Sequence, residues 1–283
     1  MQYGCGVVDK PCGLEIYVCP VCKGGLHQEQ DTLCCTACSH SYFVRGDIPD
    51  FIEEELSRSN DPVLRRMTAI DRMARIYETS MWYPIVLYLY GGFHSTSLAK
   101  LVDAISQKVS STKGKVLDVA CGPGTFGRHV ASPTREVFGI DVSGRMLRQG
   151  TVYASQDGVL NMHFARARVE MLPFEAETFD AVICCGSLHL FADTKVALTE
   201  IARVAKSDAI LAVFTFTAGR KGILKYRRVR EWSRKNHGLH VFEIPEMRQY
   251  LADAGFHNFQ PEVSGSILTF SAKKTAVASS LRN

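Results

Sequence analysis

Four of the ten cysteines are spaced as two pairs that could bind one metal ion together. Cys19 and Cys22 form one CxxC pair, Cys35 and Cys38 form a second, and twelve residues separate the pairs. Zinc takes four thiolates in a tetrahedron, and each CxxC turn supplies two of them. Redox pairs or buried thiols do not explain this double spacing. We expect a zinc ribbon within residues 1–55, whose folding free energy comes largely from Zn²⁺.

A glycine-rich turn between two acids forms the second chemically suggestive group. The turn in VLDVACGPGTFG follows Asp118, and Asp141 ends the next strand. Glycines let the backbone approach a ligand closely, and an acid at Asp141 can accept hydrogen bonds from both hydroxyls of a ribose. Asp118 would repel a pyrophosphate, and the spacing of a dinucleotide site and the P-loop lysine are missing. We therefore expect a cationic nucleoside without phosphate, as S-adenosylmethionine is.

The elements around this turn alternate between strands and helices. We expect strands over 115–119, 136–140, 162–165, 179–184 and 209–217, and helices over 127–131, 143–154 and 195–204. Such alternation predicts an α/β fold in which helices cover both faces of a parallel sheet. A further helix over 245–255 and strands from Phe259 onward follow. Ligands bind to such sheets beyond the carboxyl ends of the strands, which is where the glycine turn lies.

Four motifs in this order resemble the class I S-adenosylmethionine-dependent methyltransferases. They are VLDVACGPGTFG, VFGIDVSGRML, EMLPFEAETFDAVICCGSLHLFAD and ALTEIARV, and the resemblance extends over about residues 114–273. It is strongest to the ubiquinone/menaquinone-type small-molecule enzymes. The N-terminal CPVCKGGL also resembles the 23S rRNA guanine-N1 methyltransferases and a group of cyanobacterial and plastid proteins. The family implies a Rossmann-like sheet, mostly parallel, with an antiparallel last strand.

The resemblance also implies roles for individual residues. Residues of the turn would face the methionine part of the cofactor, Asp141 the ribose, Met146 the adenine, and the segment after the fourth strand the sulfonium. The expected cofactor-binding residues are Asp118, Ala120, Gly122, Gly124, Asp141, Val142, Met146, Arg168, Val169, Ser187 and Leu188.

Two of these residues depart from the family pattern. Ala120 stands where the first glycine is usual, and as the smallest alternative it should be tolerated with a slight backbone shift. Arg168 stands where many relatives place an acid that bonds the adenine amino group. A guanidinium cannot accept that bond, so we expect Arg168 to stack or point outward, with the backbone of Val169 serving the adenine.

Three side chains are candidates for the transfer step itself. His189, just past the fourth strand, would act as a general base or contact the substrate, although it could instead orient a loop. Tyr83 and His240 are weaker candidates. The segment CCGSLH after the fourth strand carries no signature of exocyclic amine methylation. It fits O- or C-methylation of a small molecule better.

Two further segments have more than one interpretation. The aromatic stretch 81–93, within a helical lid or linker over 56–110, either packs in the core or covers a substrate pocket. Within the methyltransferase domain over 111–275, the insertion 218–240 holds eight Lys and Arg against one Glu. It is either a solvated helical face or a surface that covers an anionic substrate or contacts a membrane or RNA phosphates. Residues 276–283 are expected to be a tail.

Composition and charge limit the class of protein. The chain has 283 residues, 46% hydrophobic, with a net charge of +4, which permits an anionic partner without requiring one. It has no apolar run of the ~18 residues that a membrane helix needs, and it begins without a secretory signal. We expect a cytoplasmic protein without stable membrane insertion. Its oligomeric state is left open.

Three functions remain in competition. The first is methyl transfer from S-adenosylmethionine to a small-molecule acceptor, which would be anionic or aromatic. The alternative is an rRNA or tRNA base methyltransferase that grips RNA with the zinc ribbon. The second alternative is a protein that binds S-adenosylmethionine without transferring its methyl group, which Arg168 would explain.

Overall fold

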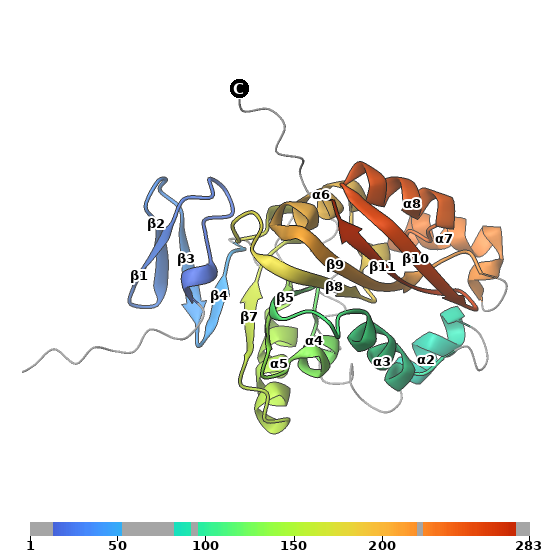
Figure 1. The fold of residues 1–283 in the computed structure, drawn as a ribbon, viewed down its shortest axis with the longest axis horizontal. Helices are drawn as coiled ribbons and strands as arrows, with labels where there is room; N and C mark the ends of the chain where they lie inside the picture. The colour runs from blue at the N-terminus through green and yellow to red at the C-terminus, as the bar shows by residue number, and fades with distance from the viewer. Residues whose placement is uncertain (1–13, 53–81, 92–95, 220–222, 276–283) are drawn as a thin grey trace, which may run out of the picture.

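The computed structural model describes residues 14–52, 82–91, 96–219 and 223–275, and its strands form one mixed sheet (Figure 1). The order across the sheet is β1-β2-β3-β4-β7-β6-β5-β8-β9-β11-β10. The strands are β1 (Leu26–Glu29), β2 (Thr32–Cys35), β3 (Ser41–Arg45), β4 (Ile48–Asp50), β5 (Gly114–Val119), β6 (Arg135–Asp141), β7 (Met162–Arg166), β8 (Phe179–Cys185), β9 (Ala205–Phe216), β10 (Phe256–Ser264) and β11 (Ile267–Lys274).

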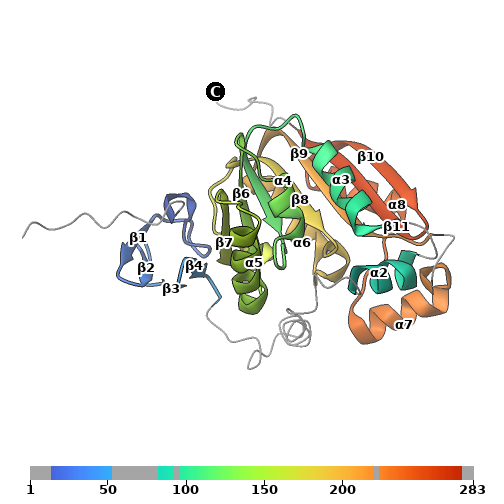
Figure 2. The same cartoon turned by 90° about the horizontal axis from the view of Figure 1, so that it is seen from below.

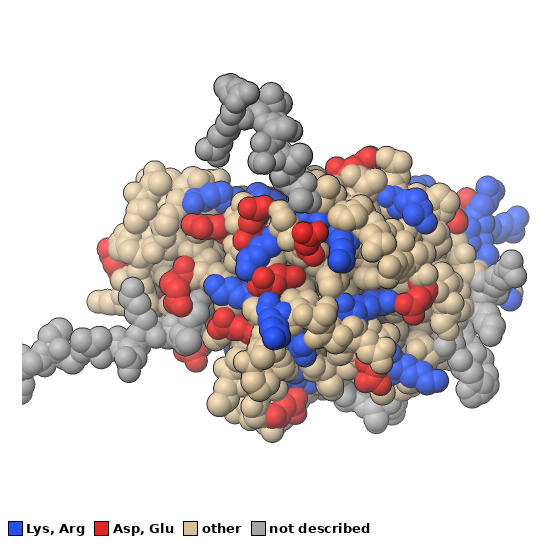
Figure 3. Space-filling model, viewed as in Figure 1, with Lys and Arg blue, Asp and Glu red and all other residues tan. Residues whose placement is uncertain are grey.

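Helices cover both faces of the central strands. The longer helices are α3 (Leu98–Lys108), α4 (Thr125–Val130), α5 (Gly144–Gln156), α6 (Thr194–Val204), α7 (Arg227–His237) and α8 (Ile244–Asp253). The shorter ones are α2 (Trp82–Val86), η1 (Leu14–Ile16), η2 (Leu87–Gly91), η3 (Val169–Met171), η4 (Leu188–Leu190) and η5 (Ile223–Lys225). Helices α3, α4 and α5 lie on one face, and α6 and α8 lie on the other (Figures 1 and 2). Charges of both signs are interspersed over the face seen in Figure 3.

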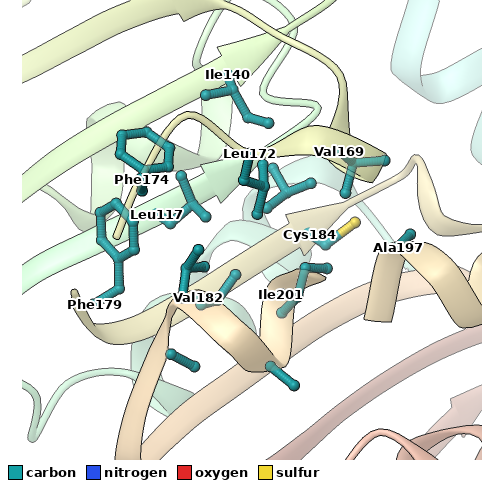
Figure 4. Packing of buried hydrophobic residues seen from close by; sticks show 14 of the residues in the cluster. Leu117, Ile140, Val169, Leu172, Phe174, Phe179, Val182, Cys184, Ala197 and Ile201 are labelled. Atoms are coloured by element: carbon teal, nitrogen blue, oxygen red, sulfur yellow. The ribbon is translucent and has the colours of Figure 1, made fainter. Parts of the chain in front are cut away.

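The central strands have the predicted mixed topology. β7, β6, β5, β8 and β9 run parallel, and β11 is antiparallel to both β9 and β10. Alternate residues of β5 enter the two cores: Val116 belongs to the hydrophobic cluster that includes residues of α3. Leu117 belongs to the cluster that includes Ala197 and Ile201 of α6 (Figure 4). This confirms the α/β fold class and the antiparallel last strand.

The N-terminal ribbon continues this sheet. Its strands β1 to β4 are antiparallel to one another, and Asp50 at the end of β4 pairs with Arg166 of β7 in parallel. One hydrophobic cluster runs across the junction: the ring of Tyr17 lies 5.4 Å from that of Phe51 and 5.3 Å from that of Phe174. The ribbon and the α/β region therefore share a core.

Some expectations differ at element boundaries or fall outside the described residues. Strand β9 begins at Ala205 rather than at Ala209, and its pairing with β8 is irregular between Ala205 and Ile210. Residues 56–81 of the expected helical lid or linker and the tail over 276–283 lie outside the described residues. In the part of the chain that the structure describes, no helix is long and apolar enough to cross a membrane.

Candidate cofactor cavity and cysteine cluster

A cavity of about 320 Å³ opens where the parallel strands end. Its size falls in the range of small-molecule sites. Its walls come from the loops after β5, β6, β7 and β8, from the end of β9 and from α2 and η2. The lining residues are Tyr83, Val86, Leu87, Tyr90, Ala120, Gly122, Ile140, Asp141, Val142, Ser143, Met146, Ala167, Arg168, Val169, Glu170, Gly186, Ser187, His189, Leu190, Phe191, Phe214, Phe216 and Leu239.

The glycine turn reaches this cavity through left-handed backbone. Ala120, Gly122 and Gly124 have φ values of 53°, 55° and 76°. Ala120 and Gly122 line the cavity, whereas Gly124 begins α4 behind it. A Cβ at Gly124 would lie 2.8 Å from the Cε of the flexible Met162 side chain, so it is mainly the left-handed conformation that favours glycine there.

The carboxylate of Asp141 fixes two backbone segments of the cavity wall. One carboxylate oxygen accepts the amide N–H of Gly122 at 2.9 Å, and the other accepts that of Ser143 at 2.8 Å. The Ser143 hydroxyl in turn accepts the N–H of Met146 and caps α5. The carboxylate lies at the cavity wall, where a ribose hydroxyl could donate to it.

Asp118 lies beneath the turn, outside the lining set. Its side chain is buried, and one carboxylate oxygen accepts the N–H of Gly127 at 3.0 Å. The other is the one buried side-chain N or O atom among the described residues without a hydrogen-bond partner. Burial, with a smaller contribution from the negative charge of Asp141, raises the pKa of this carboxyl to about 8. The hydrogen bond that it accepts from Gly127 stabilises the turn.

The residues predicted to contact the adenine line the same cavity. Val142, Met146, Arg168 and Val169 all line the cavity, and Glu170, which the sequence reasoning missed, lines it too. The Nε of Arg168 lies 3.5 Å from a carboxylate oxygen of Glu170. The acid absent at position 168 is thus present two residues later, in the predicted motif EMLPF.

Among the candidates for the transfer step, His189 and Tyr83 both line the cavity. His189 is 4% exposed, its Nδ1 lies 3.2 Å from the hydroxyl of Thr215, and its ring meets Phe216 edge-on at 4.8 Å. Burial lowers the pKa of its imidazole to about 3, so the ring is neutral near pH 7. Tyr83 is buried on α2.

Two predicted residues lie outside the lining set. His240 contacts the carboxylate of Glu246 at 3.0 Å and stacks on Phe242, and only its backbone N–H reaches the carbonyl of His189. Leu188 is fully buried in the core, while its neighbour Ser187 lines the cavity and donates to the carbonyl of Ala120.

The structure brings the four predicted cysteines together. Their Sγ atoms all lie within 4.8 Å of one another; Cys22 is 3.4 Å from Cys35 and from Cys38, and Cys19 is 3.7 Å from Cys38. A zinc tetrahedron with Zn–S bonds of about 2.3 Å has edges of about 3.8 Å. The donor set and spacing therefore fit Zn²⁺.

The sharp bend of the first cysteine turn lies at Lys23, which has a left-handed φ of 59°. Gly24 is needed for space, because a Cβ there would lie 2.7 Å from that of Ala37 and 3.2 Å from two cysteine Sγ atoms. Its N–H also points to the Sγ of Cys22, at 3.4 Å.

The basic insertion contributes little to the cavity. Within its described part, Leu239 is the residue that lines the cavity, and the arginines and lysines of α7 lie elsewhere. Exposed basic side chains of α7, such as those of Arg228 and Lys235, are therefore available to a partner outside the cavity.

Two parts of the chain match known protein families. Residues 116–208 match a methyltransferase domain family, and residues 14–47 match the Trm112p-like protein family. The ubiquinone/menaquinone biosynthesis C-methyltransferase UbiE of Allorhizobium ampelinum is 31% identical over 170 residues, which are 58% of this chain and 65% of that protein. The uncharacterized chloroplastic methyltransferase At2g41040 of Arabidopsis thaliana is 28% identical over 173 residues, 57% of this chain and 47% of that protein.

The fold has solved relatives as well. The crystal structure of the YcgJ protein from Bacillus subtilis superimposes with a TM-score of 0.55 at 17% identity, covering 63% of this chain and 99% of that one. The chain spans about half to two thirds of the length of the two curated relatives above. It contains a class I S-adenosylmethionine-dependent methyltransferase domain, preceded by a Trm112p-like segment that carries the four-cysteine cluster.

Proposed function

We propose that this protein transfers a methyl group from S-adenosylmethionine to an oxygen or carbon atom of a small, largely apolar acceptor. The observation that carries the proposal is the composition of the cavity. One end has Asp141 and the glycine turn, which suit a nucleoside, and the other is walled by aromatic and aliphatic side chains such as Tyr83, Tyr90 and Phe216. An aromatic or quinone-like acceptor matches such walls. The relative UbiE is named as a C-methyltransferase of quinone biosynthesis.

The residues present would hold the cofactor along one wall. Asp141 would accept from the ribose hydroxyls, Val142 and Met146 would pack against the adenine, and Glu170 would offer a carboxylate near its amino group. When bound, S-adenosylmethionine supplies an activated methyl group on a sulfonium. The protein then has to align the acceptor with that methyl group and exclude water, and the enclosing apolar walls do both.

In this proposal His189 orients the acceptor rather than removing its proton. With its pKa lowered to about 3, the imidazole is a weak base at neutral pH, and its burial beside Thr215 keeps it fixed. A neutral ring in the cavity wall can still exchange a hydrogen bond with an acceptor hydroxyl or carbonyl. Tyr83, on the facing element, is the second polar group that would contact the acceptor.

The four-cysteine cluster, we further propose, holds a structural Zn²⁺. None of the four cysteines is among the residues that line the cavity. The ion would stabilise the ribbon, whose strands are only three to five residues long.

Titration calorimetry and a transfer assay test the proposed activity. We expect S-adenosylmethionine to bind, Asp141→Ala to weaken binding at least tenfold, and Asp103→Ala, at an exposed acid on α3, to leave it unchanged. Labelled methyl transfer to a panel of phenols and quinols should follow. Binding without transfer to any acceptor would support the non-methylating alternative, and the absence of binding would remove the cofactor assignment.

A further inference from the structure

Exposed apolar side chains gather on two short neighbouring segments. Thirteen large hydrophobic residues are exposed in the described chain, and six of them lie within 82–91 and 223–237. These six residues, called the apolar patch below, are Ile85, Tyr88, Leu89, Ile223, Tyr226 and Trp232. Single exposed apolar residues are ordinary, but a cluster on so few residues marks a contact surface.

The first segment, α2 with η2, has one face that lines the cavity and another that is exposed. Tyr83, Leu87 and Tyr90 point inward and line the cavity. Ile85, Tyr88 and Leu89, spaced as neighbours on the opposite side of the helix, are exposed. The segment is therefore a thin wall between the cavity and the outside.

The second segment, η5 with α7, adds positive charge. From Lys225 to Lys235 it carries six Lys and Arg against Glu231 alone. Arg228, Trp232 and Lys235 have helical spacing i, i+4, i+7, so they share one exposed face, on which Trp232 is 57% exposed. The paired Arg227 and Glu231 lie beside this face.

The two segments form one surface. η2 and η5 contact each other, and Leu224 of η5 is buried with Tyr83 and Leu87 in the same hydrophobic cluster. Helices α2 and α7 lie side by side at one end of the molecule (Figure 2), and Lys and Arg side chains protrude at that end in Figure 3.

We propose that this surface docks on an anionic lipid bilayer. Basic residues attract an anionic membrane surface, and aromatic and aliphatic side chains beside them insert into the boundary between headgroups and acyl chains. RNA would use the arginines and could stack on Trp232, but it offers nothing apolar for Ile85, Leu89 and Ile223. The surface thus combines positive charge with exposed apolar side chains, and both favour binding to an anionic membrane.

Docking would also explain how an apolar acceptor reaches the cavity, an argument that rests on the proposed function. The outward face of α2 and η2 would lie in the bilayer, and their inward face forms the acceptor end of the cavity. An acceptor dissolved in the membrane would then be separated from the cavity only by the short segment of α2 and η2.

Co-sedimentation with vesicles tests the docking surface directly and needs no turnover. The full chain should bind vesicles of equal phosphatidylcholine and phosphatidylglycerol, bind pure phosphatidylcholine much less, and lose affinity as salt rises. Each basic residue near such a surface contributes about fivefold in affinity, so Arg228→Gln with Lys235→Gln should weaken binding roughly 25-fold. Ile85→Ser with Leu89→Ser should weaken it roughly tenfold.

Two matched controls separate this surface from general charge and hydrophobicity. Lys113→Gln with Lys115→Gln removes the same charge elsewhere, and Val152→Ser with Leu160→Ser removes two other exposed aliphatic side chains; both should bind vesicles as the original chain does. Equal binding to neutral and anionic vesicles, or equal losses in the controls, would overturn the proposal. So would tighter binding to single-stranded RNA that the same Arg228 and Lys235 changes abolish. Calorimetry with S-adenosylmethionine on every variant keeps a failure of docking distinct from a failure of the proposed activity.

Discussion

Ala120 adopts a backbone conformation that glycine adopts without strain. Its φ of 53° costs an alanine about 1 kcal/mol, and the hydroxyl of Ser187 donates to its carbonyl, which a glycine keeps. Ala120→Gly should therefore raise the free energy of unfolding by up to about 1 kcal/mol, measured by urea denaturation. Ala252→Gly, at an exposed position of α8, is the opposite control and should lower it by a similar amount. A loss of stability in Ala120→Gly would mean that its methyl group packs usefully in the cavity wall.

His189 predicts a pH dependence of stability. Its pKa is about 3 in the folded protein against 6.5 in the unfolded chain, so between these values the unfolded chain binds a proton that the folded protein does not. Its contribution to stability is therefore complete above pH 6.5 and is lost as the pH falls toward 3. Compared with His189→Gln, the original chain should lose about 2 kcal/mol of unfolding free energy between pH 7.5 and pH 5.

Urea denaturation at the two pH values measures this difference, and the carboxyl groups common to both proteins cancel in it. His257→Gln, which removes an exposed histidine on β10, controls for the loss of a titratable ring. A difference between the original chain and His189→Gln that stays constant from pH 5 to pH 7.5 would contradict the burial of a neutral imidazole.

The residue types of the site were predictable from the sequence, but their directions were not. Strand, acid and glycine spacing correctly predicted that the turn and Asp141 share one cavity, because strand ends of a parallel sheet meet. Asp118 was expected to face the ligand, yet the alternation of β5 points it under the turn. Glu170 was missed because the family pattern places the acid at position 168, two residues earlier, although an acid two residues after an arginine was a signal in the sequence.

At the scale of elements, the contact between β4 and β7 depends on one buried ion pair. Arg166 donates to both carboxylate oxygens of Asp50 at 3.0 Å and, through Nε, to the carbonyl of Val142 in the cavity wall. The sequence of neither strand indicates that Asp50 and Arg166 form a pair, because the two residues lie 116 positions apart. The ribbon and the sheet were predicted correctly from the sequence. Their contact through β4 and β7 was not, because it joins residues far apart in the chain and local patterns do not encode such pairing.

This ion pair can be tested against a second arginine on the same acid. Arg166→Met leaves the buried carboxylate of Asp50 without its main partner, and we expect a loss of roughly 3 kcal/mol in unfolding free energy. Arg45, whose side chain is 66% exposed, also approaches Asp50 at 3.6 Å, and Arg45→Met should cost less than about 1 kcal/mol. Similar losses in both variants would show that the contact between β4 and β7 is held by something other than the buried pair.

At the scale of the whole molecule, the ribbon and the methyltransferase domain should unfold together. The cysteine cluster lies at the end of a hydrophobic core that continues from Cys19 and Tyr17 to Phe174 and Phe179 under the central strands. A metal ion held by the four thiolates would therefore stabilise more than the ribbon, because loosening the ribbon exposes part of the common core.

Removing the metal tests this coupling. Cys22→Ser should lower the zinc content from one ion per chain to near none and shift a single calorimetric unfolding transition to lower temperature. Cys34→Ser changes a neighbouring cysteine that lies with His27 and Glu29, outside the four-cysteine cluster, and it should leave both the zinc content and the transition unchanged. A Cys22→Ser protein that unfolds in two separate transitions, the later one at the original temperature, would show that the shared core does not couple the two regions. A single shifted transition would mean that the ribbon is an integral part of the folded methyltransferase domain, since a loosely tethered appendage could not lower the melting temperature of the sheet that it adjoins.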